Sequence, residues 1–122
     1  MLSRAAELMA MEIRNHDWSD APYRVDRAGH RRDKDSNSSG ITALSKWETE
    51  GILTNVMFVT AQVLGSDDPN FDSMEYAKAC GVPERYLNGY VDSGIRKNDS
   101  GLIESPETWA GQKRVFSDPR SK

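Results

Sequence analysis

The stretch EYAKACGVPERYLNGYVDSGI, residues 75–95, has the spacing of two short helices joined by a tight turn. A helix-turn-helix needs a small residue where its helices cross, a turn residue that tolerates unusual backbone angles, and apolar residues inside the second helix. The residues at these places are Ala77, Gly81, Val82, Leu87 and Tyr90. Pro83 suits the first turn of a helix, because its missing N–H would be unpaired there. The pattern therefore predicts a second helix that begins near Pro83.

In the same register, the stretch resembles the DNA-binding helix-turn-helix of MerR-like regulators and the related phage excisionases. The matching residues are Ala77, Lys78, Gly81, Val82, Leu87, Tyr90, Gly94 and Ile95. The later KRVFS, from Lys113, is similar to the basic-aromatic strand that closes the wing of these families. The resemblance covers about residues 74–118, and it implies a helix-turn-helix over 72–95 and a wing over 96–118.

This resemblance also implies a set of DNA contacts. The second helix would present Glu84, Arg85 and Asn88 outward, and arginine or asparagine can form paired hydrogen bonds to base edges in the major groove. Arg85 and Asn88 are therefore the candidates for base reading. The basic residues expected to position that helix against phosphates are Arg96, Lys97, Lys113 and Arg114. On this interpretation the partner is duplex DNA.

Two further helices are predicted, over about 3–15 and 43–64. In the first, apolar residues from Leu2 to Ile13 recur at three- and four-residue steps. In the second, Ser45 and Glu48 have capping-box spacing, and Gly65 suits the left-handed residue past a helix end. The residues expected on the buried face of this second helix are Trp47, Ile52, Val56, Val59 and Val63.

Between these helices, residues 17–40 show no period and contain many Ser and Asp residues, so we expect an irregular linker. Its part from Tyr23 to Lys34 carries a net charge of +3, which fits either an arm along phosphates or a solvated linker. The expected division is residues 1–40, as N-terminal helix and linker, and residues 41–122, as a helical domain. The N-terminal helix and linker are the candidate contacts for a homodimer or a protein partner.

Composition limits the function classes. The 122 residues carry a net charge of −3, which argues against general coating of nucleic acid by Lys and Arg side chains. The one cysteine, Cys80, cannot form an internal disulfide and suits a reducing compartment, so we expect a cytoplasmic protein with Cys80 in its core. The longest apolar run, residues 52–64, is too short for a membrane span.

No phosphate-cradling glycine loop, nucleophile motif or metal-ligand cluster is visible, so neither an enzyme nor a cofactor is expected. His16 and His30 have no second histidine three or four residues away to complete a metal site, so we expect both on the surface.

The fold class expected is mainly α: a small helical domain with a C-terminal helix-turn-helix, with or without a wing, preceded by a helix and a linker. The first functional hypothesis is a small DNA-binding regulator, acting in transcription or recombination and in one version encoded by a phage. The alternative is a non-enzymatic phage accessory protein, inhibitor or virion protein that uses the fold to bind protein. Residues 72–122 carry eight acidic and eight basic side chains, a balance that keeps this alternative open.

Overall fold

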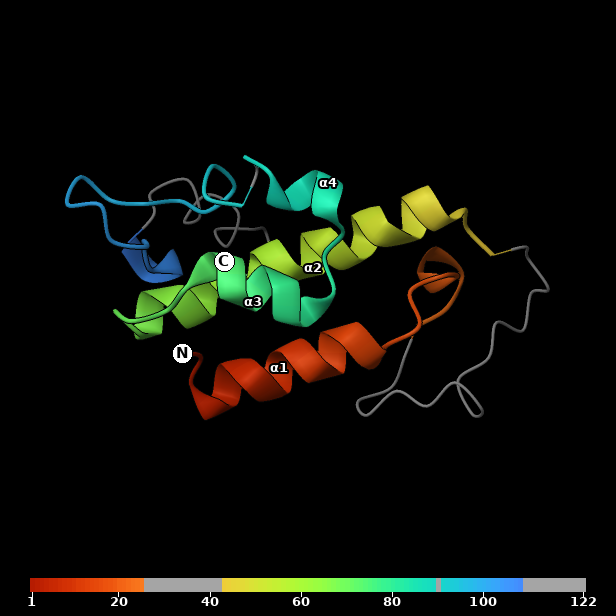
Figure 1. Cartoon of the computed structure of the whole chain (residues 1–122), viewed down its shortest axis with the longest axis horizontal. Coiled ribbons are helices and arrows are strands. Elements are labelled where there is room, and N and C mark those ends of the chain that lie inside the picture. Colours follow the sequence, from red (N-terminus) through yellow and green to blue (C-terminus); the bar gives the residue numbers. More distant parts are fainter. Residues whose placement is uncertain (26–42, 90, 109–122) are drawn as a thin grey trace, which may run out of the picture.

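A computed structural model of the chain describes residues 1–25, 43–89 and 91–108. The described residues form helices and turns with no strand, so the mainly α class is confirmed (Figure 1). α1 and α3 run antiparallel to α2 and pack against it. The elements are α1 (Arg4–Asn15), the 3-10 turn η1 (Ala21–Tyr23), α2 (Lys46–Asp67), α3 (Ser73–Cys80), α4 (Glu84–Leu87) and the 3-10 turn η2 (Pro106–Thr108). Among the described helices, none has the length and apolar character required to cross a membrane.

The helix starts follow local capping signals. The backbone N–H of Glu48 donates to Ser45 Oγ at 3.1 Å, and the Ser45 N–H donates to Glu48 Oε1 at 3.0 Å, which completes the predicted capping box. At α3, the Asp72 carboxylate accepts the N–H groups of Met74 and Glu75. The predicted helices over 3–15 and 43–64 are therefore confirmed as α1 and α2, with α2 shifted a few residues toward the C-terminus.

One face of α2 was assigned wrongly. Val59 and Val63 were expected in the core, but their side chains are 70% and 53% exposed, and Trp47 is 65% exposed. The buried residues are Thr54, Met57, Ala61, Gln62 and Gly65. Because α2 is apolar on nearly every side, its hydrophobic pattern does not distinguish the face that meets α1 and α3 from the opposite one.

The expected helix stop at Gly65 is also wrong, because α2 continues to Asp67. Gly65 instead permits a close approach by the segment after α4. A Cβ atom at this position would lie 2.4 Å from Ile103 Cδ1 and 3.0 Å from a ring carbon of Phe71. The glycine is therefore explained by packing rather than by helix termination.

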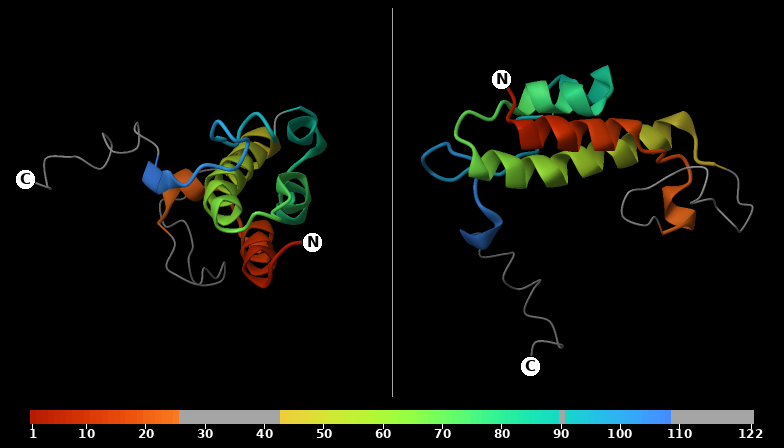
Figure 2. Two further views of the ribbon diagram at one scale, coloured as in Figure 1. Left: turned by 90° about the vertical axis from the view of Figure 1, so that its left-hand side faces the viewer. Right: turned by 90° about the horizontal axis from the view of Figure 1, so that it is seen from below.

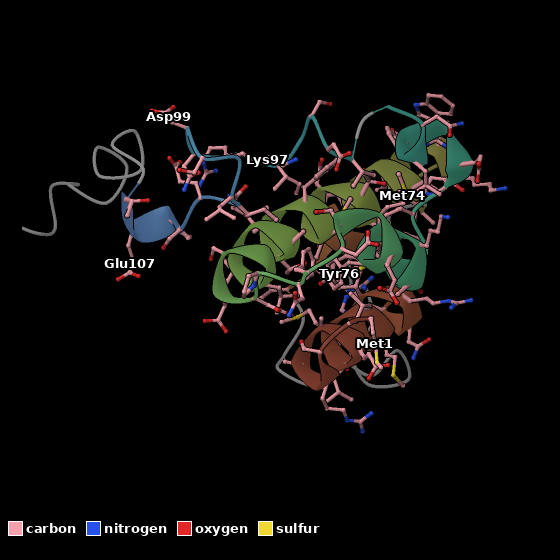
Figure 3. The ribbon with its side chains drawn as sticks, turned by 60° about the vertical axis from the view of Figure 1, so that its left-hand side comes forward. Met1, Met74, Tyr76, Lys97, Asp99 and Glu107 are labelled. Carbon is pink, nitrogen blue, oxygen red and sulfur yellow. The ribbon has the colours of Figure 1, made fainter. Side chains whose placement is uncertain are left out.

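α1, α2 and α3 share one core (Figure 2). Tyr76 of α3 is fully buried among the three helices, and its hydroxyl lies 2.7 Å from Thr60 Oγ1 of α2 (Figure 3). α1 contributes four buried residues: Leu2 beside its N-terminus, Ala6, Ala10 and Ile13. The N-terminal helix, expected as an extension, is thus part of the domain core.

The segment after α1 is more ordered than expected. The Trp18 indole N–H donates to the Ile13 carbonyl at 2.9 Å, and Asp20 forms an ion pair with Arg24 in which both side chains are 4% exposed. η1 lies in this segment, so the prediction of no regular structure is wrong at residues 21–23, whereas the other residues of 17–25 are turn or irregular chain. An Asp side chain forms a hydrogen bond to the nearby backbone, and Pro restricts the backbone, so short turns form in this segment. Residues 26–40, with most of the predicted basic arm, lie outside the described residues.

The turn between α3 and α4 follows the prediction, but the second helix does not. Gly81 ends α3 with a φ of +89°, and the Val82 N–H donates to the Ala77 carbonyl at 3.1 Å. α4 begins after Pro83 and covers only residues 84–87. Gly89 has a φ of +84°, so the Asn88–Gly89 pair turns the chain where the predicted helix would continue.

Candidate functional site

The start of α2 meets α4 at a surface built around Arg85. The Arg85 guanidinium carbon lies 3.7 Å from the centroid of the Trp47 ring and 4.5 Å from that of Tyr86. Both distances are within the range of a cation–π interaction. We call the four residues Trp47, Glu50, Arg85 and Tyr86 the Trp47 surface.

Polar contacts fix this arrangement. Arg85 Nη1 forms an ion pair with Glu50 Oε1, and Arg85 Nη2 donates to the Trp47 carbonyl at 3.2 Å. The hydrogen bond to Glu50 raises the pKa of Arg85 above its ordinary value. The expectation that Arg85 points outward is therefore wrong, because its side chain folds back onto α2. No local pattern could reveal this contact, since Trp47 and Arg85 are far apart in sequence.

The Trp47 ring remains 65% exposed despite these contacts. Beside Tyr86 lies a surface pocket of about 330 Å³ between α2 and the turn that follows α4. Its lining residues are Gly51, Thr54, Asn55, Phe58, Tyr86, Ser93 and Gly94. Tyr86 and Phe58 therefore give this pocket an aromatic wall. The exposed Trp47 ring stacks on the same Arg85 guanidinium as the Tyr86 ring.

The other residues expected on the outward side of the second helix, Glu84 and the base-reading candidate Asn88, are exposed. Glu84 is the first residue of α4, and Asn88 is the residue that caps its end, where its backbone N–H donates to the Glu84 carbonyl at 3.4 Å. Glu48 is also exposed, at the start of α2. The surroundings of the Trp47 surface therefore include two exposed carboxylates, Glu48 and Glu84, and one exposed cation, Lys46. Exposed carboxylates repel phosphate groups.

The candidate phosphate contacts have different environments. Arg96 Nε lies 3.3 Å from Glu104 Oε1 in an ion pair, whereas Lys97 is exposed. Lys97 pairs with Ile103 in one antiparallel bridge, which closes a turn over residues 98–102. This bridge lies where the wing was expected. Lys113, Arg114 and the rest of the predicted wing lie outside the described residues.

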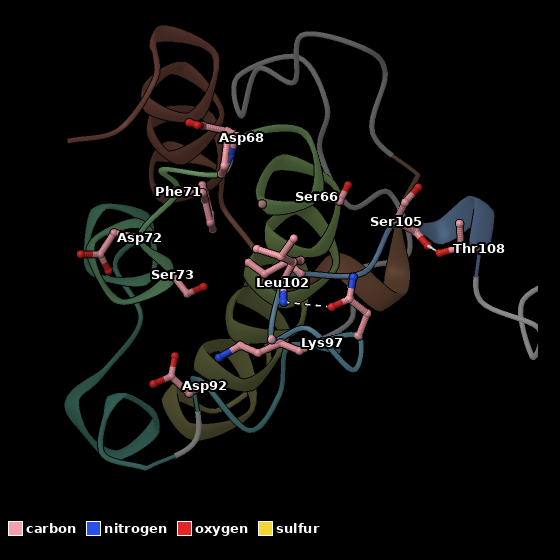
Figure 4. Close-up of a pocket in the computed structure, with 15 residues that line it drawn as sticks. Ser66, Asp68, Phe71, Asp72, Ser73, Asp92, Lys97, Leu102, Ser105 and Thr108 are labelled. Atoms are coloured by element: carbon pink, nitrogen blue, oxygen red, sulfur yellow. Dashed lines mark hydrogen bonds between the residues drawn. The ribbon is translucent and has the colours of Figure 1, made fainter.

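A larger pocket of about 760 Å³ lies between the end of α2, the start of α3 and this turn (Figure 4). Three aspartates, Asp68, Asp72 and Asp92, line it together with Lys97. Asp72 already accepts the first N–H groups of α3, so its carboxylate has a capping role. In the described part of the chain, no group of three or more His, Cys, Asp or Glu side chains is placed to hold a metal ion.

The buried titratable groups belong to the core. Burial raises the pKa of the Cys80 thiol to about 11 and raises that of the Tyr76 hydroxyl as well. A thiol in this state is poorly nucleophilic at neutral pH. Cys80 is fully buried and free, as the sequence predicted.

The residues that sequence reasoning missed are Glu50 and Tyr86, which have no motif of their own and gain their positions from Arg85. Comparisons of the chain with protein-family models, with curated proteins and with solved structures found no match.

Proposed function

We propose that this chain is a small, non-enzymatic helical protein that binds another protein through the Trp47 surface. The observation that carries the proposal is an exposed tryptophan in contact with a partly exposed guanidinium. Trp47 is 65% exposed, and the Arg85 guanidinium carbon stacks on its ring, 3.7 Å from the centroid. Because most of the Trp47 ring is exposed, it contributes little to core packing, and its ordered position is available to a partner.

Energetic considerations support this assignment. Tryptophan, tyrosine and arginine dominate the residues that carry most of the binding energy in protein interfaces. Side chains that are already ordered lose less conformational entropy on binding, which favours affinity. The Arg85 side chain of α4 contacts the Glu50 carboxylate and the Trp47 carbonyl of α2, and it stacks on the Trp47 ring. These contacts order Arg85 and Trp47 before a partner binds.

Charge favours protein over duplex DNA as the partner of this surface. Glu50 pairs with Arg85, while Glu48 and Glu84 are exposed beside it. A partner segment with an aromatic or aliphatic anchor and a basic residue would complement these rings and carboxylates. A free, buried Cys80 is consistent with a cytoplasmic location.

The experiment is photo-crosslinking in the full chain, with the photoreactive residue at the exposed position of Glu84 in cells that produce the protein. We expect a discrete protein adduct that disappears in Trp47→Ala and in Arg85→Ala. Leu8→Ala, on the outer face of α1, is the matched control and should retain it. Adducts that persist unchanged in both variants would overturn the assignment, provided that circular dichroism shows folded proteins.

The second candidate is the DNA-binding regulator of transcription or recombination. It is favoured by the order α3, Gly81 turn, α4, and by the exposure of Asn88 and Lys97. If the protein reads DNA, Asn88→Ala should weaken the free energy of binding to a preferred duplex by about 1–3 kcal/mol. It should have little effect on binding to a duplex of random sequence. Lys97→Ala should instead reduce the slope of log affinity against log salt by about one.

A further inference from the structure

The pocket beside Tyr86 continues the Trp47 surface along α2. Gly51 lies one helical turn after Trp47, on the same side of the helix, and it lines this pocket of about 330 Å³. Tyr86 belongs to the Trp47 surface and also lines the pocket. The pocket, which we call the Gly51 pocket, is therefore continuous with the surface proposed to bind protein.

Gly51 is an unexpected residue inside α2. Glycine within a helix lowers stability relative to alanine, because it loses more backbone freedom on folding. α2 begins at Lys46 and ends at Asp67, so Gly51 lies well inside it. Beyond its own stretch of helix, a Cβ atom at this position would meet the Tyr86 hydroxyl oxygen at 3.7 Å, an ordinary van der Waals distance. The fold therefore accommodates alanine here and does not require glycine.

Every other glycine in the described part of the chain has a structural reason. Three have positive φ values, which strongly favour glycine. At the other two, a Cβ atom would lie 2.4 Å from a carbon atom of a packed side chain. Gly51 has neither reason, so its role lies in the space that it leaves open. The first group is Gly81, Gly89 and Gly101, and the second is Gly65 and Gly94.

The lining of the Gly51 pocket combines aromatic rings with neutral polar groups. Phe58 and Tyr86 supply the rings, and Thr54, which is 3% exposed, supplies a hydroxyl. This hydroxyl donates to the Glu50 carbonyl at 2.8 Å, so its oxygen can still accept a hydrogen bond. The exposed Asn55 amide can both donate and accept. Among the described residues that line the pocket none is charged, so an ionised group would find no partner there.

We propose that the Gly51 pocket takes a tyrosine side chain of the protein partner. This inference rests on the proposed function, because the pocket shares Tyr86 with the Trp47 surface. Aromatic rings pack offset or edge to face against one another, so Phe58 and Tyr86 suit a phenol ring. The phenol hydroxyl can donate to the Thr54 oxygen or exchange a hydrogen bond with the Asn55 amide. A volume of about 330 Å³ lies at the small end of ligand sites, which suits one large side chain.

The charges around the pocket select for an unmodified tyrosine. Glu48 and Glu84 are exposed beside the Trp47 surface, against one exposed cation, Lys46. The whole chain carries a net charge of −3. A phosphate group on the tyrosine would enter an uncharged lining and meet a negative field, so phosphorylation of the partner would prevent binding.

Titration of the full chain with para-cresol, the side-chain analogue of tyrosine, tests the pocket before the partner is known. In ¹H–¹⁵N NMR spectra we expect saturable shifts at the amides of Gly51 and Gly94, at up to about 5 mM ligand, which covers millimolar dissociation constants. Toluene, which lacks the hydroxyl, should bind about fivefold more weakly, the effect of one net hydrogen bond. Para-cresyl phosphate should not shift these amides.

Two substitutions of Gly51 separate the pocket from the fold. Gly51→Val should abolish para-cresol binding, because a short, branched side chain at this position fills the pocket. Val63→Ala, at an exposed position farther along α2, is the control and should retain it. Gly51→Ala should raise the urea midpoint of unfolding, whereas Gly65→Ala should lower it through the contact with Ile103.

Three results would overturn the inference: no saturable shift with para-cresol, equal affinity for toluene, or unchanged para-cresol binding in Gly51→Val. A lower urea midpoint for Gly51→Ala would also overturn it, because the fold itself would then require the glycine.

Photo-crosslinking from position 84 distinguishes this failure from failure of the proposed function. We expect Gly51→Val to lose the protein adduct, as Trp47→Ala does. An adduct that is lost in Trp47→Ala but retained in Gly51→Val would leave protein binding in place and overturn the tyrosine pocket. An adduct that persists in both Trp47→Ala and Arg85→Ala would instead contradict the proposed function, and with it a partner tyrosine at this site.

Discussion

Gln62 and Val63 are neighbours on α2, yet the polar side chain is 7% exposed and the apolar one 53%. The Gln62 amide nitrogen donates to the carbonyls of Arg96 and Glu104 at 3.1 and 2.7 Å, and its oxygen accepts the Arg96 N–H at 2.9 Å. These bonds replace the water that burial removed. The comparison teaches that neighbouring segments, rather than hydropathy, decide which side of an uncharged helix lies inside.

The contrast between the inner and outer faces of α2 leads to the largest expected effect. Met57 is fully buried on the inner face, so Met57→Ala should reduce the free energy of unfolding by about 2–5 kcal/mol through lost burial and a cavity. Val59→Ala on the outer face should change it by less than about 0.5 kcal/mol. Urea unfolding at low protein concentration measures both values. Equal costs at the two positions would contradict the assignment of the faces.

Gln62→Leu tests whether hydrogen bonds hold the buried amide. Removal of the amide takes away the Gln62 partner of the Arg96 N–H and of the Glu104 carbonyl, while the Arg96 carbonyl keeps the Glu104 N–H at 3.0 Å. We therefore expect the free energy of unfolding to fall by about 1–3 kcal/mol. Amide exchange at Arg96 should accelerate at the same time. Asn55→Leu, an exposed position of the same helix, is the control and should leave both quantities nearly unchanged. If Gln62→Leu proved stabilising, apolar burial would outweigh the three hydrogen bonds.

Ser45→Ala removes the side-chain cap of α2 and should lower the free energy of unfolding by about 1 kcal/mol. Thermal unfolding measures this change. The Ser45 N–H lowers the pKa of Glu48, so this contribution is present above the ordinary carboxyl pKa of 4.5 and is lost as pH falls through the lowered folded-state pKa. Alanine keeps this backbone N–H, so Glu48→Gln is the variant whose difference in stability from the wild type should shrink in acid. A difference that grows as pH falls would show that Glu48 does not complete the cap.

Arg85→Ala should have the smallest effect on stability, because its ion pair with Glu50 is partly exposed to water. Its effect should appear in dynamics instead: relaxation of the Trp47 indole ¹⁵N–H should report faster motion once the stacked guanidinium is gone. Glu50→Gln keeps the size of the side chain and should produce a weaker change of the same kind. Unchanged Trp47 relaxation would remove the argument for a pre-ordered ring.

Local signals in the sequence were sufficient for part of this structure. Ser45 with Glu48 and the glycine turn at 81 each act within a few residues. α2 begins at its capping box, and α3 ends at its glycine, as these signals indicate. The early end of α4 had a local signal too, in the Asn88–Gly89 pair, which the resemblance to a longer recognition helix outweighed.

Other features depend on contacts between distant residues. The inner face of α2 is defined by α1, α3 and the segment 94–104, and residues 51–66 carry no charge that marks the outside. Arg85 was assigned to a DNA groove because the family resemblance placed it on the outward face of a recognition helix. Its actual partners, Trp47 and Glu50, follow from the fold alone.

The central claim is that α4 supports a protein-binding surface and does not read DNA. Fluorescence anisotropy of a labelled random-sequence duplex with the full chain, from about 50 mM salt upward, tests it most directly. The account predicts no saturable binding at the lowest salt, and no difference between wild type and Lys97→Ala. Saturable binding that weakens steeply with salt and is reduced by Lys97→Ala would contradict the account and establish the DNA-binding interpretation.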